Sequence, residues 1–398
     1  MKKLVFSAFS VVSAIGNGQQ ETLSNLQAGH SGLAPSKFAS LPIAAYTGEV
    51  DRLADTVLPA QWSEYDCRNH RLAMQALLQD GLLDAIEAAK TRYTPSRIGL
   101  FLGTSTSGIL ETEQAYRQRD PNTGFLPTTL HYPNTHNTYA LGRFVREVLK
   151  LQGPSYVIST ACAATSKTFA SAARMIDAGI CDAALVGGVD TLCGTTMFGF
   201  HALGVIAEGP CRPFDAERNG ISIGEGAGFV LLERLHDGHH EHSIQLLGVG
   251  ESSDAYHMSS PHPQGEGARA AMQNALLAAG LEAEEIDYIN LHGTATVIGD
   301  AAEDKAVSGL FGSTVPCSSS KGFTGHTLGA SGVLGAIFGA LALQAQFIPG
   351  SPHTRTVDPG CLINYQCVGK HAPVRHVLCN TFGFGGVNCS VILGTVGK

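Results

Sequence analysis

Short apolar runs alternate with helical patterns along this 398-residue chain, and this alternation constrains the fold more than any other feature. Apolar residues at Phe169, Ala173, Ile176 and Ile180 have the spacing of one face of a helix, which Gly179 ends. Strands that alternate with helices predict a layered α/β architecture. Runs that predict buried strands occur at 4–12, 97–102, 156–159, 183–186 and 226–232.

The second half of the chain repeats this order of elements. The polar stretch HDGHHEHS, at 236–243, is the best candidate for a junction. We therefore predict two similar halves, 1–240 and 241–398, which hint at a duplication although the residue-level repeat is weak. Strands are predicted in the second half at 244–250, 287–291, 374–380 and 388–394, and helices at 268–279, 300–310 and 327–347.

The composition limits the classes of function that the chain can serve. A hydrophobic content of 44% allows a large core, and a net charge of -8 argues against nucleic-acid binding, which needs a basic face. The 10 cysteines form no CxxC pair, so neither a zinc ribbon nor a redox motif is predicted. Scattered cysteines of this kind indicate a reducing, cytoplasmic compartment.

Two segments imitate membrane signals. The N-terminal MKKLVFSAFSVVSAIGNG places two lysines before an apolar run, as a signal peptide does, but no clean cleavage box follows. The segment 327–347 lacks formal charge and is long enough to span a bilayer, yet it contains Ser331, Gln344, Gln346 and many glycines. We interpret the first segment as a buried strand and the second as a core helix, and predict no membrane span.

A lone cysteine in ISTACAATSKTFASAA, at 158–173, is the first candidate for chemistry. Cys162 follows an apolar strand and comes at the start of a helical pattern. The orphan N–H groups and the dipole at a helix start favour a thiolate, and the same turn can offer N–H groups to an oxyanion. An inert buried thiol is the alternative, and it is the commoner role of such a cysteine.

Three further segments carry polar groups in turns after strands. His292 ends a strand in LHGTATVIGD, and Lys321 and His326 lie in the loop SSSKGFTGHTLGASG. A structural histidine is the usual alternative for His292, and Asp300 to Glu303 resembles a helix capping box. The fourth segment, NTFGFGGVN, has glycines that let backbone amides approach a ligand. Together these groups predict an active site, because α/β proteins place active sites in turns after strands.

The four segments resemble the motifs of the β-ketoacyl-[acyl-carrier-protein] synthase family of the thiolase-like superfamily. STACAATS resembles its nucleophile turn, HGTATVIGD and SSKGFTGHTLGASG its histidine and lysine motifs, and NTFGFGGVN its glycine loop. The block at 211–233 also matches, and the resemblance extends from about Val5 to Leu393. It implies a layered αβαβα fold built from two similar, duplicated halves, and an acyltransferase of the elongating branch.

The resemblance implies a role for each reacting group. Cys162 would accept an acyl chain from the phosphopantetheine of an acyl carrier protein. His292 and His326 would bind the thioester carbonyl of malonyl-carrier protein and promote its decarboxylation, and the enolate would then attack the acyl-cysteine. The backbone N–H groups of Cys162 and Phe384 would form the oxyanion hole.

The resemblance also implies supporting roles. Lys321 would be held by Glu303 and would support the histidines electrostatically. Thr294 and Thr296 would touch the pantetheine arm, and Phe384 would gate the acyl pocket. No bound cofactor or metal is implied, because the substrates arrive on the phosphopantetheine of the carrier protein. The HHEH run at 239–242 is interpreted as a solvated junction rather than a metal site. GEGAG, at 224–228, precedes a strand and so fails the dinucleotide fingerprint.

Two stretches depart from the family pattern and leave the acyl chain open. Many elongating members carry an apolar gate residue near Thr106, in GTSTSG at 103–108, so the resemblance implies that Thr106 is a substrate-binding residue. The stretch 129–141 is also unusual. Both departures suit a specialised polyketide or aryl-polyene ketosynthase.

The resemblance implies a dimer, either of identical chains or with a chain-length-factor-like homologue. A non-catalytic partner subunit of such a heterodimer is the alternative function, but dead partners typically lose the cysteine that this chain keeps as Cys162. A degradative thiolase is less favoured, because position 384 is Phe and Cys389 lies beyond the glycine loop.

Overall fold

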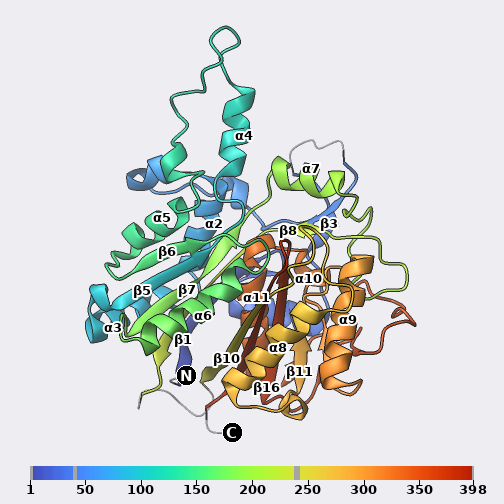
Figure 1. The fold of residues 1–398 in the computed structure, drawn as a ribbon. Helices are drawn as coiled ribbons and strands as arrows, with labels where there is room; N and C mark the ends of the chain where they lie inside the picture. The colour runs from blue at the N-terminus through green and yellow to red at the C-terminus, as the bar shows by residue number, and fades with distance from the viewer. Residues whose placement is uncertain (1–2, 39–42, 237–242, 397–398) are drawn as a thin grey trace.

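The computed structural model describes residues 3–38, 43–236 and 243–396, and it shows helices layered on both faces of a large twisted sheet (Figure 1). The predicted junction at 236–243 lies outside the described residues except for its two ends, and so does the HHEH run. The boundary between the halves therefore stays a prediction.

The main sheet has 12 strands, and 10 of them divide equally between the two halves of the chain. The first half supplies β1 (Leu4–Ser13), β5 (Ile98–Gly103), β6 (Ser155–Ile158), β7 (Ala183–Asp190) and β9 (Gly226–Arg234). The second half supplies β10 (Ile244–Ser253), β11 (Tyr288–Asn290), β12 (Pro316–Ser318), β16 (His376–Gly383) and β17 (Val387–Thr395). The short strands β2 (Gly16–Asn17) and β14 (Asn364–Tyr365) complete the sheet.

The two halves share one topology. The strand order is β14-β12-β11-β16-β17-β10-β1-β9-β7-β5-β6. We number the five main strands of each half in chain order and read each half from the outer edge of the sheet to its centre. Both halves then have the order third, second, fourth, fifth, first. The second strand of each half is parallel to the third and fourth, and the fifth is antiparallel to both its neighbours. The halves meet through a short antiparallel contact of β1 with β10. The duplication that the sequence hinted at is therefore present in the fold.

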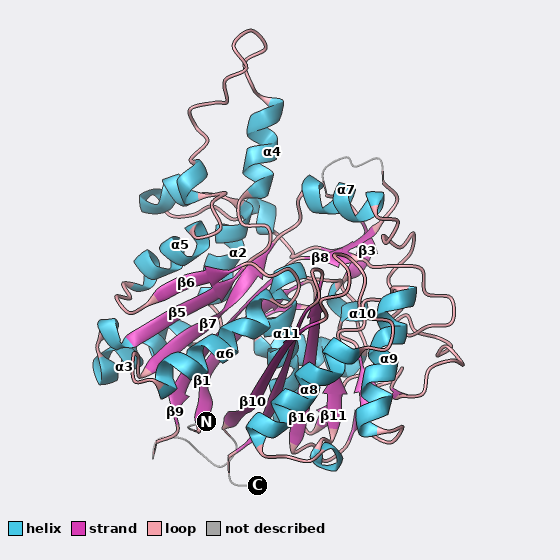
Figure 2. Ribbon diagram, in the orientation of Figure 1, coloured by secondary structure: helices cyan, strands magenta, loops and turns pink. Residues whose placement is uncertain are grey.

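Two helices form the central layer between the halves. The helix α6 (Ala164–Asp177) follows β6, and α11 (Ser331–Ala345) follows β12 after the one-turn helix α10 (Lys321–Thr324) and a 3-10 turn. These two helices contact each other and strands of both halves. The outer layers contain α2 (Arg68–Leu77), α3 (Leu82–Tyr93) and α5 (Ala140–Leu149) on the first half, and α8 (Glu266–Ala279) and α9 (Val297–Phe311) on the second (Figure 2). The predicted αβαβα layering is thereby confirmed.

The apolar segment that imitates a membrane span is a core helix, as predicted. The stretch Leu328–Ala345 is long and apolar enough to cross a membrane, but 83% of it is buried inside the protein. Its glycines allow close packing: a Cβ at Gly332 would lie 2.5 Å from the backbone nitrogen of Ser166, and one at Gly339 would lie 2.8 Å from Cys379 Sγ. The N-terminal segment is likewise the buried strand β1, which pairs with β9 and β10.

The remaining elements lie at the ends and edges of the layers. In Figure 1, α4 (Ile109–Arg117) and the loop after it project from the body. GEGAG leads into β9, a strand, as the sequence analysis expected. The other elements are α1 (Gln19–Ala28), α7 (Gly194–Ala202), α10 (Lys321–Thr324), β3 (Leu33–Pro35), β4 (Tyr46–Gly48), β8 (Ile223–Gly224), β13 (Phe347–Ile348), β15 (Lys370–His371) and short 3-10 turns.

Candidate active site

Cys162 lies in a tight turn between β6 and the buried helix α6. The residue before it, Ala161, has φ of 49°, a left-handed conformation that costs a non-glycine residue energy. This conformation reverses the chain direction within a few residues of the end of the strand. Cys162 itself is 6% exposed, so the thiol is held below the surface.

His292 is anchored through its backbone. Its N–H and that of Gly293 donate to the Glu303 carboxylate at 2.8 and 2.7 Å. Glu303 lies on α9 and is buried, and its position fixes the chain where it leaves β11.

The predicted capping box at Asp300 to Glu303 is wrong. The helix α9 begins earlier, at Val297, and its N-cap is Thr296, whose hydroxyl accepts from the Gly299 N–H. The Asp300 carboxylate instead accepts from backbone N–H groups outside the helix, those of Phe214 at 2.7 Å and Ala295 at 3.1 Å.

Lys321 contacts His292 rather than Glu303. The Lys321 ammonium donates to the His292 carbonyl oxygen and lies 3.3 Å from His292 Nδ1. The predicted ion pair with Glu303 is absent from the described residues, and the Glu303 oxygens accept instead from the two amides and from Asn380 at 3.3 Å. The Glu303 charge still raises the pKa of Lys321, against a larger lowering by burial.

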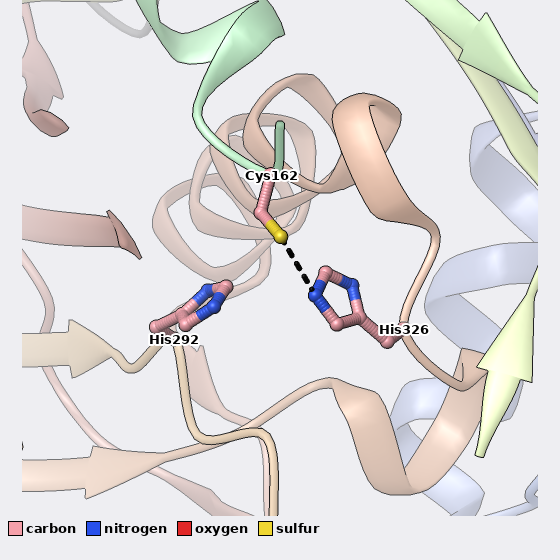
Figure 3. Close-up of side chains that lie close together, drawn as sticks. All are labelled: Cys162, His292 and His326. Atoms are coloured by element: carbon pink, nitrogen blue, oxygen red, sulfur yellow. Dashed lines mark hydrogen bonds between the residues drawn. The ribbon is translucent and has the colours of Figure 1, made fainter. Parts of the chain in front are cut away.

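His326 is held from both halves of the chain. Its N–H donates to the Ser222 carbonyl at 2.7 Å, and the Gly224 N–H donates to its carbonyl at 3.0 Å. The side chain points at the thiol: Nε2 lies 3.1 Å from Cys162 Sγ (Figure 3). The Leu328 N–H donates to Nδ1 at 3.1 Å. Because Nδ1 accepts, a neutral His326 carries its proton on Nε2, facing the thiol.

The thiol and the two imidazoles converge on one point (Figure 3). One ligand atom from each of Cys162, His292 and His326 lies within 4.8 Å of the others. The rings are nearly perpendicular, with centroids 5.4 Å apart. The Lys321 ammonium beside His292 Nδ1 requires that nitrogen to accept, so a neutral His292 also carries its proton on Nε2. The site therefore offers two neutral Nε2–H donors.

Burial dominates the electrostatics of the site. It raises the pKa of Cys162 to about 11, although the Lys321 charge and two backbone N–H groups lower it. The expectation that the helix start would favour a thiolate is thus outweighed in the free protein by the loss of hydration. Burial, followed by the Lys321 charge, holds the pKa of both His292 and His326 well below the usual range, so both rings are neutral near pH 7.

The glycine loop between β16 and β17 lies against the nucleophile turn. A Cβ on Gly383 would lie 3.3 Å from the backbone nitrogen of Cys162, and Gly385 and Gly386 adopt φ of 83° and 75°. The backbone N–H groups of Phe384 and Cys162 both lower the pKa of the thiol, so both lie beside its sulfur. These are the two groups predicted to form an oxyanion hole, and that role stays a prediction.

A cavity of about 380 Å³ opens onto these groups, and it is mostly apolar. Phe384 lines this cavity and is 38% exposed. Its ring centroid lies 5.7 Å from that of Phe200. Of the predicted site residues, the described lining includes Cys162, His292, His326, Glu303, Thr294, Thr296 and Phe384. Thr106 lies elsewhere: it is buried, and its hydroxyl donates to Asp190 at 2.7 Å.

Cys162, His292 and His326 lie close enough together to hold a metal ion. The Lys321 ammonium, 3.3 Å from His292 Nδ1, disfavours a second cation there. The apolar cavity suits an organic thioester better than a hydrated ion.

Sequence reasoning missed three groups that shape the site. Asn380 contacts Glu303 at 3.3 Å, and the Ser331 hydroxyl lies 3.0 Å from His326 Nδ1. The Asp190 carboxylate accepts from N–H groups of the loop at 103–108 and of the turn after His326. Asp190 could have been noticed, because a carboxylate that ends a fully apolar strand must find buried partners. Nothing in the sequence around Asn380 or Ser331 distinguishes them from ordinary polar residues.

Comparisons with known proteins agree with this site and fold. Family models described as the N-terminal and C-terminal domains of beta-ketoacyl synthase match residues 1–238 and 244–355. The 3-oxoacyl-[acyl-carrier-protein] synthase 2 of Vibrio cholerae is 31% identical over 424 residues, with 98% of each chain covered. The protein of the same name from Staphylococcus aureus is 29% identical over 410 residues, also with 98% of each chain covered.

The structural comparison gives the same result. A chain from the complex of a ketosynthase with its chain length factor from Xenorhabdus doucetiae matches with a TM-score of 0.90 and 35% identity. The match covers 99% of this chain and 98% of that chain. The duplicated fold and its thiol–imidazole cavity therefore define a thiolase-like acyltransferase. Within that class, this chain belongs to the β-ketoacyl synthase family.

Proposed function

We propose that the protein catalyses decarboxylative condensation of a cysteine-bound acyl chain with malonyl-carrier protein, and so extends a fatty-acid, polyketide or polyene chain. One observation carries this proposal: Cys162 Sγ and two neutral imidazole rings share one buried cavity. A nucleophile alone would support acyl transfer. The pair of N–H donors beside it supports the stabilisation of an enolate as well.

The first half-reaction transfers the acyl group to Cys162. The thiol attacks the carbonyl of the incoming thioester, and the N–H groups of Cys162 and Phe384 receive the developing oxyanion. Because the free thiol has its pKa raised to about 11, deprotonation must accompany attack. The positive charge of Lys321 lowers the energy of the transient thiolate. The products are the acyl-cysteine and the free thiol of the carrier arm.

The second half-reaction forms the carbon–carbon bond. The Nε2–H groups of His292 and His326 donate to the malonyl thioester carbonyl, and loss of carbon dioxide leaves an enolate whose oxygen they stabilise. The enolate carbon attacks the acyl-cysteine carbonyl, the C–S bond breaks, and the thiolate of Cys162 takes back a proton. Neutral rings suit this role, because they donate without protonating the enolate carbon.

The substrates arrive on the phosphopantetheine arm of an acyl carrier protein, which is the carrier named for the curated relatives. Thr294 and Thr296 line the cavity, and their hydroxyls lie 3.0 Å apart. We assign them to hydrogen bonds with the amides of that arm. No resident cofactor enters either step.

The two threonines give separable predictions. Thr294→Val should raise the KM for carrier-bound substrate several-fold and leave thermal stability unchanged. Thr296→Ala should also remove the N-cap of α9 and lower the free energy of unfolding by about 1 kcal/mol. Steady-state kinetics and thermal unfolding of both variants check this, and equal unfolding temperatures would contradict the N-cap assignment.

Removing the charge of Lys321 should change the pH dependence of decarboxylation. Lys321→Met removes one cause that keeps the pKa of His292 and His326 low, so both pKa values should rise. The rings are neutral only above their pKa. As the pH falls, the variant should therefore lose activity at a higher pH than the wild type does. Rates of malonyl decarboxylation between about pH 5 and pH 8 measure this shift. An acid limb at the wild-type position would contradict the electrostatic role.

The edge of the sheet suits a second subunit. The strand β6 ends the strand order and is only partly buried, and an exposed edge of this kind is normally covered. The relative from Xenorhabdus doucetiae is described with its chain length factor, which favours a heterodimer with a homologous subunit over a homodimer. The free state of all 10 cysteines supports a cytoplasmic location.

The alternative of a non-catalytic partner subunit is less favoured. Cys162, His292, Lys321 and His326 are all present and lie together in space. A silent subunit needs none of these buried polar groups, each of which costs free energy to bury.

Reconstituted condensation tests the proposed function. Acyl-carrier protein and malonyl-carrier protein with a ¹³C-labelled free carboxyl are mixed with the protein, alone and with a homologous ketosynthase-like subunit. One labelled carbon dioxide should be released for each β-ketoacyl-carrier formed. No product under either condition would refute the enzymatic function.

A further inference from the structure

Asp190 is a fully buried carboxylate that the mechanism above does not use. It ends β7, a strand whose residues are all buried, and it is 0% exposed. Burial raises its pKa, and the groups that oppose this effect most strongly are hydroxyls and backbone N–H groups of the loop at 103–108. A carboxylate in such surroundings is costly unless every lone pair is used.

The unusual loop GTSTSG wraps this carboxylate. Asp190 Oδ1 accepts from the Thr104 hydroxyl at 2.8 Å, from the Ser105 N–H at 2.8 Å, and from both the N–H and the hydroxyl of Thr106 at 2.7 Å. The Thr106 hydroxyl also accepts from the Thr191 N–H at 3.1 Å. An apolar residue at 106 would remove one hydroxyl donor from Asp190 and would leave the Thr191 N–H without this partner, which explains the hydroxyl there.

The other oxygen reaches the second half of the chain. Asp190 Oδ2 accepts from the Gly329 N–H at 2.6 Å. Gly329 belongs to the short turn Leu328–Ala330, whose first N–H donates to His326 Nδ1 at 3.1 Å. A Cβ on Gly329 would lie 2.7 Å from Oδ2, so this approach requires glycine. Asp190 thus anchors the turn that sets the tautomer of His326.

The same loop contacts the nucleophile turn. The Ser105 hydroxyl donates to the carbonyl of Ala161, the strained residue before Cys162, at 3.4 Å. The carboxylate therefore links the turn that carries the thiol with the turn that carries the imidazole, although the two come from different halves of the fold.

We propose that Asp190 is a positioning residue, which acts with Thr106 to hold the Cys162 turn and the His326 turn in register. The inference rests on the proposed function. It gives the loop at 103–108, which departs from the family pattern, a role in aligning the reacting groups, in place of the substrate-binding role predicted for Thr106.

Replacement of Thr106 tests this proposal with little change of volume. Thr106→Val should lower kcat for both acyl transfer and malonyl decarboxylation by about tenfold, with KM within about twofold, because a hydrogen bond to a charged group is lost. Thr106→Ser should restore kcat. Thr112→Val is the matched control, since it removes another buried hydroxyl, which contacts His136 at 2.7 Å. Asp190→Asn should reduce both rates at least as much as Thr106→Val.

Alkylation of Cys162 by iodoacetamide needs no carrier protein, so it separates this inference from the proposed function. The alkylation rate at about pH 8 should fall several-fold in Thr106→Val, because the thiolate loses aligned N–H donors, and should match wild type in Thr106→Ser and Thr112→Val. Wild-type kcat and alkylation in Thr106→Val would overturn the proposal. So would losses in Thr112→Val equal to those in Thr106→Val. Absent condensation by wild type would instead refute the proposed function, while the alkylation result still decides this one.

Discussion

Cys162→Ala should abolish condensation, with a fall in rate on the order of 10³-fold or more, because the described lining of the cavity contains no second thiol to hold the acyl chain. Malonyl decarboxylation should survive in this variant. His292 and His326 keep their contacts with Lys321 and Leu328, and neither contact involves the thiol. Parallel assays of product formation and carbon dioxide release measure the two outcomes separately.

Cys193→Ala is the matched control for this substitution. Cys193 is also buried, it occupies the N-cap position of α7, and burial likewise raises its pKa to about 11. It does not line the described cavity. We expect wild-type condensation from this control. Equal losses in the two variants would mean that the effect comes from removing a buried thiol rather than from removing the nucleophile.

His292→Ala and His326→Ala should each lower malonyl decarboxylation by ~10²–10³-fold, which is the usual cost of removing one donor from a developing oxyanion. The two variants should differ in the first half-reaction. Only His326 contacts the thiol, so acyl transfer should slow more in His326→Ala than in His292→Ala. Decarboxylation and acylation rates for each variant, measured under single-turnover conditions, check both expectations.

Three further variants, His292→Gln, His326→Gln and His376→Ala, define the cause. His→Gln at either position retains an N–H donor on a flexible side chain and should recover part of the rate. His376→Ala removes an imidazole at the start of β16, at the end of the strand away from the glycine loop, and should leave both half-reactions unchanged. Decarboxylation at the wild-type rate in both histidine-to-alanine variants would contradict the enolate-stabilising role.

Much of the fold could be predicted from the sequence, because strand and helix periods are local. The layered α/β class, the buried first strand and the apolar core helix all follow from patterns within about 20 residues. The shared strand order of the two halves could not be read from these patterns, because it depends on pairings such as β1 with β9, whose residues are far apart in the chain.

The site was predictable to the extent that its groups lie in motifs. Cys162, His292, Lys321 and His326 each follow a strand or a glycine turn, and the resemblance placed them together. The partner of Lys321 was not predictable, because it depends on how the tertiary structure places the ammonium relative to the His292 carbonyl and the Glu303 carboxylate. The raised pKa of Cys162 was not predictable either, since a helix start favours a thiolate only while the thiol keeps some hydration.

The most direct test of the central claim is the intact mass of the protein during one turnover. On mixing with acyl-carrier protein, the wild-type chain should gain one acyl mass, and peptide mapping should place it on Cys162. Addition of malonyl-carrier protein should then remove that mass as β-ketoacyl-carrier appears. An acyl mass that persists in Cys162→Ala, or one that malonyl-carrier protein does not discharge from the wild type, would contradict the account.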